Sequence, residues 1–215
     1  MAIRSGTFRL HPALTDVLNA VDGTPIGTAF KDRAIDLVNT TFFEEPIDKA
    51  EALRAHHWLI DRAGADGLPL TAAGYLKPAD ALAFAEVVPT MQEWPFGFTR
   101  ESDARPLLWF RQHLVSAGLF RKYRGTLQAT KVARAGLVDP AVLWAALAAR
   151  VIPARHRFGE AASVVIAVHA ATNGDGAMDA DAVARTLSAA GWTHDDRGAV
   201  SERDVYPLWN DLWAG

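Results

Sequence analysis

The sequence contains no cysteine, so disulfide bonds, thiolate metal sites and a cysteine nucleophile are excluded. It also lacks a long apolar run. The longest, from Ala161 to Ala171, includes Ser163 and His169 and is far shorter than the roughly 20 residues that cross a bilayer. The opening residues, MAIRSGTFRL, have no apolar core of a signal peptide. We therefore expect a cytoplasmic protein with no membrane partner.

An excess of positive charge is also missing, because 25 acidic residues stand against 22 basic ones and the net charge is −3. Such a balance argues against a protein that coats nucleic acid without specificity, since that mode of binding requires many neutralised phosphates. A local basic patch stays open. Half of the residues are hydrophobic and 22% are charged, which is typical of a folded globular protein.

The motifs of common enzymes are absent as well. The chain has no G-x-S-x-G elbow, no G-x-x-x-x-G-K-[ST] phosphate loop and no G-x-G-x-x-G dinucleotide turn. The acidic pairs Asp195-Asp196 and Glu44-Glu45 fall in predicted solvated loops. We predict no catalytic residue and no cofactor. An enzyme of unreadable class remains an alternative, because catalytic residues far apart in sequence leave no motif.

Two segments have a partial likeness to metal sites. NGDGAMDADAVA (173–184) resembles a calcium loop, but Met178 and Ala184 occupy the positions that require glycine and a bidentate glutamate. His56 and His57, with Asp61 four residues beyond His57, are the second candidate, and no further ligand can be identified. Turn and helix-surface positions explain both segments, so no metal is expected.

The hydrophobic spacing predicts a mainly α fold with eight or nine helices, a small β-hairpin at 119–130 and a strand near 68–71. We divide the chain into an N-terminal helical segment (1–66), a winged-helix-like domain (67–152) and a C-terminal helical segment (153–215). No linker-like composition separates them, so they are expected to pack as one body.

The clearest pattern lies at 104–136. ARPLLWFRQHLVSAGLF predicts a helix that begins near Pro106 and ends at Gly118. RKYRGTLQAT then alternates around the turn dipeptide Arg124-Gly125, and KVARAG predicts a short helix. A helix, a hairpin and a further helix in this order are typical of the second half of a winged helix, which makes a winged-helix-like central unit in a helical body the expected architecture.

A helical wheel divides the 104–118 helix into two sides. Leu107, Phe110, Leu114 and Val115 form the apolar side, and the polar side carries Arg105, Trp109, Gln112, His113 and Ser116. Arginine and glutamine suit base edges, and no acidic residue occurs between Arg105 and Asp139. The candidate nucleic-acid-binding residues are therefore Arg105, Gln112, Arg121, Lys122, Arg124 and Lys131.

A protein-interaction or assembly module is the function that the sequence favours. A tryptophan on the polar side suits a protein contact better than a DNA groove, and aromatic side chains dominate protein binding energy. The candidate contact residues are Trp94, Phe96, Phe98 and Trp109. The partner would be another protein or a second copy, because residues 173–204 hold seven acids and three bases and oppose the basic region.

Three segments carry a family resemblance: GLPLTAAGYLKP (67–78), TRESDARPLLWFRQHLVSAGLFRKYRGTL (99–127) and DPAVLWAAL (139–147). Residues 67–151 resemble a region of actinobacterial hypothetical proteins that is often attached to the plasmid open-reading-frame-three-like (pRiA-type) domain. The resemblance implies a relationship, and it brings no reaction, cofactor or catalytic residue.

Overall fold

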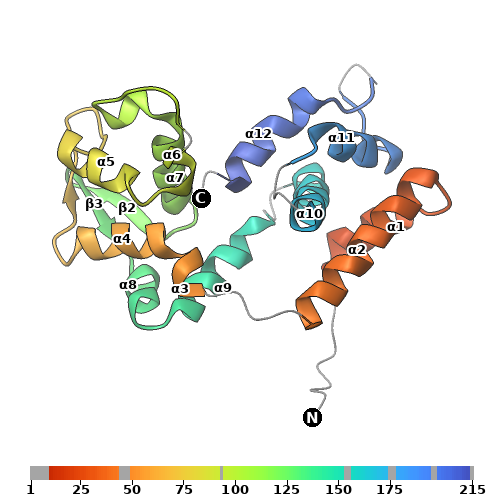
Figure 1. Cartoon of the computed structure of the whole chain (residues 1–215), viewed down its shortest axis with the longest axis horizontal. Helices are drawn as coiled ribbons and strands as arrows, with labels where there is room; N and C mark the ends of the chain where they lie inside the picture. Colours follow the sequence, from red (N-terminus) through yellow and green to blue (C-terminus); the bar gives the residue numbers. More distant parts are fainter. Residues whose placement is uncertain are drawn as a thin grey trace, which may run out of the picture. The chain divides into compact units, whose positions relative to one another are not determined.

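The computed structural model describes residues 10–43, 49–92, 94–152, 156–173, 178–194 and 198–213 (Figure 1). The chain forms two compact units. Unit 1 contains Met1–Glu44 and Ile152–Trp209, and unit 2 contains Glu45–Val151 with the terminal Asn210–Gly215. The chain therefore passes from unit 1 to unit 2 and back to unit 1, and its last residues are again assigned to unit 2. Helices dominate both units, which confirms the predicted mainly α class.

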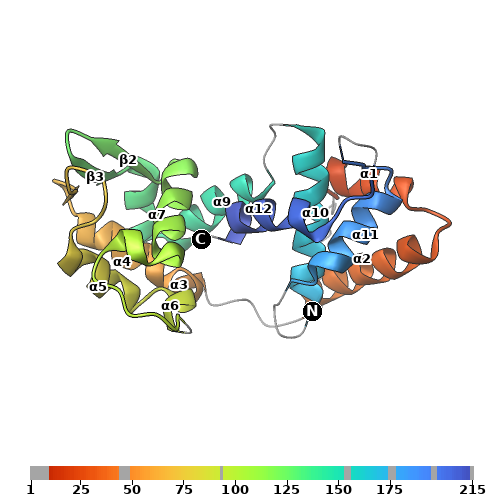
Figure 2. The same cartoon turned by 90° about the horizontal axis from the view of Figure 1, so that it is seen from above.

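Unit 1 is organised around one buried helix. Its helices are α1 (Pro12–Ala20), α2 (Pro25–Phe43), α10 (Arg157–Thr172), α11 (Ala180–Ala189) and the first part of α12 (Glu202–Trp213). Helices α1, α2 and α11 pack against α10 (Figure 2). The apolar run from Ala161 to Ala170 lies within α10, and its side chains are buried on almost every side. A helix that is apolar all round needs such a surrounding, and this explains the longest apolar run of the sequence.

Unit 2 contains seven helices, one 3-10 turn and three strands within the described residues. In chain order they are α3 (Lys49–Ala52), α4 (Arg54–Ala63), β1 (Leu68–Pro69), α5 (Pro78–Ala85), α6 (Pro89–Gln92), η1 (Glu101–Asp103), α7 (Arg105–Ser116), β2 (Phe120–Tyr123), β3 (Thr126–Ala129), α8 (Lys131–Val138) and α9 (Pro140–Val151). Helix α4 packs on β3 and α8, so residues before position 67 belong to this unit by their contacts.

The sheet of unit 2 is small and antiparallel, with the strand order β1-β3-β2. Strand β3 lies in the middle, where Leu127 pairs with Leu68 of β1 and Ala129 pairs with Phe120 of β2. The predicted hairpin is therefore present, and β1 completes it into three strands. Strand β2 lies at the edge of the sheet and follows shortly after α7 in the chain.

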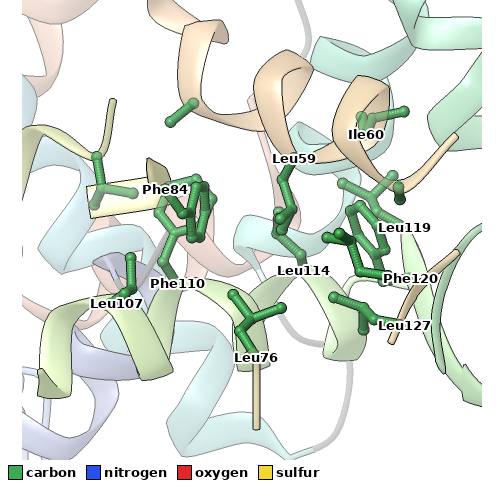
Figure 3. Packing of buried hydrophobic residues seen from close by; sticks show 14 of the residues in the cluster. Leu59, Ile60, Leu76, Phe84, Leu107, Phe110, Leu114, Leu119, Phe120 and Leu127 are labelled. Carbon is green, nitrogen blue, oxygen red and sulfur yellow. The ribbon is translucent and has the colours of Figure 1, made fainter. Parts of the chain in front are cut away.

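The core of unit 2 fixes one side of α7. Leu107, Phe110 and Leu114 project from α7 into a cluster with Leu59 of α4 and Phe84 of α5 (Figure 3). The rings of Phe84 and Phe110 meet edge to face, with centroids 5.3 Å apart. Because these side chains are almost completely buried, α7 is held in one rotational setting, and its opposite side faces outward.

The described part of the chain holds twelve α-helices, more than the eight or nine expected. The excess comes from short elements such as α3 and α6, which have four residues each and show too little periodicity to be predicted. None of the helices in the described ranges is long and apolar enough to cross a membrane.

Candidate functional site

Helix α7 presents a polar stripe on the side opposite the core. Arg105, Gln112 and Ser116 are exposed and Trp109 is half-buried. The hydroxyl of Ser116 donates to the carbonyl of His113. Within the described ranges, the side chains of Arg105 and Gln112 take part in no hydrogen bond or ion pair, so both can meet an external partner.

The end of α7 directs the chain into the hairpin. Gly118 has φ +74°, a left-handed conformation that side chains disfavour. The amide of Leu119 donates to the carbonyl of Leu114 at 3.0 Å, which closes the last turn of the helix. Leu119 and Phe120 are then buried. This anchoring places the start of β2 directly beside the end of α7.

The tip of the hairpin is basic and exposed. Arg121, Lys122, Tyr123 and Arg124 all lie on the surface. The guanidinium groups of Arg121 and Arg124 lie 5.4 and 5.1 Å from the ring centroid of Tyr123, within cation–π range. Arg121 also donates to Oε1 of Gln128 on the neighbouring strand at 3.1 Å. The tyrosine ring thus contacts two cations at the turn.

Helix α8 continues the basic character next to the end of α7. Thr130 caps α8 by accepting from the amide of Ala133, and its hydroxyl donates to the carbonyl of Gly118 at 3.0 Å. Lys131 follows at the first turn and is exposed. We call Arg105, Gln112, Arg121, Lys122, Arg124 and Lys131 the α7–hairpin surface. They come from α7, the β2–β3 hairpin and α8. Helix α7 contacts β2 (Figure 2), and the hydrogen bond from Thr130 to Gly118 joins the start of α8 to the end of α7.

One arginine of the same region is not part of this surface. Arg111 is 1% exposed and forms an ion pair with the fully buried Glu101 of η1. The other carboxylate oxygen of Glu101 accepts from the amide of Leu76 at 2.7 Å. This pair is not predicted from the sequence. The available signal was the position of Arg111 four residues after Leu107, which places it on the apolar side of the helix.

Three of the four aromatic candidates are half-buried, and the fourth, Phe96, is exposed. Trp94 and Phe98 are half-buried and pack against the core, and Trp109 is half-buried on α7. Phe96 is 65% exposed, and its ring meets that of Trp94 edge to face at 5.3 Å. The free aromatic area is therefore concentrated at Phe96.

Of the two histidines of α4, His56 is buried and His57 is half-buried. His56 is buried, and its ring lies 4.9 Å from that of Phe110. Burial, together with the charges of the nearby His113 and His57, lowers the pKa of His56 to about 4. Asp61, the third residue of this candidate, is exposed. Among the residues that the structure describes, no cluster of three potential metal ligands was found.

Unit 1 holds a second buried histidine. His169 of α10 stacks on Phe30 at 5.8 Å, and its Nε2 lies 3.3 Å from the hydroxyl of Thr186. Burial and the charge of Arg33 lower its pKa to about 4. At neutral pH the ring is uncharged, which suits a packing role inside the unit.

The segment with a partial likeness to a calcium loop (173–184) is described only in part, because 174–177 lie outside the described residues. Asp179, which follows them, caps α11 by accepting from the amide of Ala182 at 2.9 Å. This capping role accounts for an acidic residue at this position.

Comparison with known proteins identifies no relative: no family model, curated protein or solved structure matches the chain. The resemblance of 67–151 to actinobacterial hypothetical proteins therefore stays a prediction.

Proposed function

We propose that unit 2 binds duplex DNA through the α7–hairpin surface. The observation that carries the proposal is the combination of an exposed polar stripe on α7 with an exposed basic hairpin, in a segment without acidic residues from Arg105 to Val138. Exposed lysine and arginine bind phosphates, and a helix of this size fits the major groove. Tyr123 holds Arg121 and Arg124 together at the turn, which reduces the freedom they would lose on binding.

The order of elements supports a winged-helix interpretation of the unit. Helix α4, strand β1, helices α5 to α7 and the β2–β3 hairpin follow one another, and the sheet order is β1-β3-β2. In this interpretation α7 is the recognition helix and the hairpin is the wing. The outward position of Arg105 and Gln112 on α7 agrees with such a role.

The test is the salt dependence of binding to a generic duplex, measured by fluorescence anisotropy between 50 and 200 mM salt. The variant Arg121→Ala/Lys122→Ala/Arg124→Ala is compared with the control Lys31→Ala/Arg54→Ala/Arg203→Ala, which removes three exposed charges elsewhere. We expect binding that weakens with salt, and a slope of log K against log salt that becomes shallower by about 0.9 for each phosphate that the variant no longer neutralises. The control should keep the wild-type slope. Absence of binding at 50 mM salt would refute the proposal.

Protein contact through Phe96 is the second candidate, since this ring is 65% exposed beside Trp94. An exposed aromatic side chain of this size is a typical anchor of a protein interface. Gel filtration at low and high salt tests self-association. The Phe96→Ser variant should elute later than the wild type if copies meet at this ring, and identical elution of both as monomers would end the idea of self-contact.

A further inference from the structure

Two side chains of different chemistry share the exposed stripe of α7. Arg105 and Gln112 are seven residues apart, which is about two helical turns, so they point to the same side. Both are exposed, and within the described residues neither side chain has a hydrogen-bond partner or a counter-ion. Leu108 and Trp109 flank the line between them, and both are half-buried and have no side-chain acceptor.

The hairpin cations differ from these two residues in their surroundings. Arg121 is bonded to Gln128, and it shares the ring of Tyr123 with Arg124. Such clustered charges suit the phosphate backbone, which carries no sequence information. Arg105 and Gln112 lie apart from this cluster, on a helix. A helix that is bound in the major groove presents its side chains to base edges.

The spacing on the helix defines a spacing on DNA. Seven residues at a rise of about 1.5 Å span about 10.5 Å. Base pairs along one strand are about 3.4 Å apart, so a helix that follows the duplex axis covers about three base-pair steps over this length. Arginine forms a bidentate pair with guanine, and glutamine forms one with adenine.

We infer that α7 reads DNA sequence, with Arg105 on a guanine and Gln112 on an adenine about three base-pair steps away. This inference rests on the proposed function, since it names the duplex that the same surface prefers. Each good bidentate pair discriminates against the wrong base by about tenfold. A duplex that lacks both bases should therefore bind about a hundredfold more weakly.

Selection of the full chain on a randomised duplex library tests the inference. We expect enrichment of duplexes with guanine and adenine three steps apart. The variant Arg105→Ala should lose the guanine preference and keep the adenine preference, and Gln112→Ala should do the reverse. Arg54→Ala and Gln92→Ala are matched controls, because they remove the same side chains from exposed positions on α4 and α6. Their selected sequences should equal those of the wild type.

The outcomes separate this inference from the proposed function. Salt-dependent binding of the library without enrichment would overturn base readout and leave DNA binding in place. An Arg105→Ala variant that weakens all duplexes equally would make this residue a phosphate contact, which also overturns the inference. Absence of any binding by the wild type would instead remove the proposed function itself. Thermal unfolding of each variant shows whether it is folded.

Discussion

Arg111 is a charged residue that the fold keeps away from solvent, and Glu101 is its counter-charge. The pair joins three segments, because Glu101 also accepts from the amide of Leu76 in the loop before α5. Nη1 of Arg111 has no hydrogen-bond partner within the described residues. A buried ion pair in which one donor has no acceptor does not by itself indicate net stabilisation. Removal of one partner is nevertheless costly, because it leaves an isolated charge in the core.

We therefore predict that Glu101→Gln lowers the free energy of unfolding by about 3 kcal/mol, because the guanidinium of Arg111 would stay buried without its counter-charge. Urea unfolding followed by circular dichroism measures the change. Asp103→Asn is the control, since Asp103 is an exposed acid of the same short 3-10 turn. A similar loss in both variants would show that the buried pair has no special role.

His56 predicts a dependence of stability on pH. Its pKa is about 4 in the folded chain and about 6.5 in the unfolded chain. The unfolded state therefore binds the proton more readily, and stability that is present above pH 6.5 is lost as the pH falls towards 4. The full loss in the free energy of unfolding is about 3 kcal/mol.

The variant His56→Leu should reduce this loss, as measured by urea unfolding at pH 7, 6 and 5. Part of the dependence should remain, because the pKa of His169 in unit 1 is lowered as well. If the free energy of unfolding of His56→Leu depended on pH in the same way as that of the wild type, the loss of stability could not be assigned to His56.

At the scale of elements, the join between α7 and β2 depends on backbone geometry. Gly118 has φ +74°, and a Cβ at this position would meet only the side chain of Arg150 at 3.7 Å. Space is therefore available, and the cost of a side chain is conformational. We predict that Gly118→Ala lowers the free energy of unfolding by about 1 kcal/mol.

Gly97 provides the matched control for this prediction. It lies in an open loop with no atom within 4 Å of an added Cβ and without a positive φ. Gly97→Ala should leave the unfolding free energy unchanged or raise it slightly. If both variants behaved alike, the left-handed turn would not explain the need for glycine at position 118.

The helices and the hairpin were predictable where a strong local signal exists. Pro106 and Gly118 mark the ends of α7 closely, and Arg124-Gly125 marks the turn between β2 and β3. The pairing of β1 with β3 was not predictable, because it joins segments almost 60 residues apart by only two residue pairs. The Glu101–Arg111 pair was only partly predictable, because the position of Arg111 on the apolar side of α7 indicates its burial but no local pattern identifies Glu101 as its partner.

For the candidate site residues, the exposure of Arg105 and Gln112 was predictable from the sequence, and the half-burial of Trp94 and Phe98 was not. The wheel places Arg105 and Gln112 outward because the apolar residues of α7 define the inner side, and both are exposed in the structure. The helical wheel gives no signal for the half-burial of Trp94 and Phe98, because these residues lie outside α7. That property depends on how the irregular segment before η1 packs against the core, which no local pattern describes.

At the scale of the whole molecule, unit 2 has its own core. The buried cluster runs from Leu53 to Leu143, and all of its members belong to this unit. We predict that residues 49–152 fold when they are produced alone, with cooperative thermal unfolding.

A shorter fragment is the control. Residues 49–129 lack α8, which packs on α4, and α9, which packs on α8, and with them the buried Ala133 and Leu143. This fragment should unfold at much lower urea concentration or fail to fold. If 49–152 were itself unfolded, the unit would depend on the rest of the chain.

The central claim is that unit 2 binds duplex DNA with the α7–hairpin surface, and hydrogen exchange of the full chain with and without a duplex tests it most directly. We predict slower exchange of backbone amides in 105–116 and 120–129 when the duplex is added, and unchanged exchange in α10 of unit 1. Slower exchange confined to other segments, or no change at a duplex concentration that saturates binding, would contradict the claim.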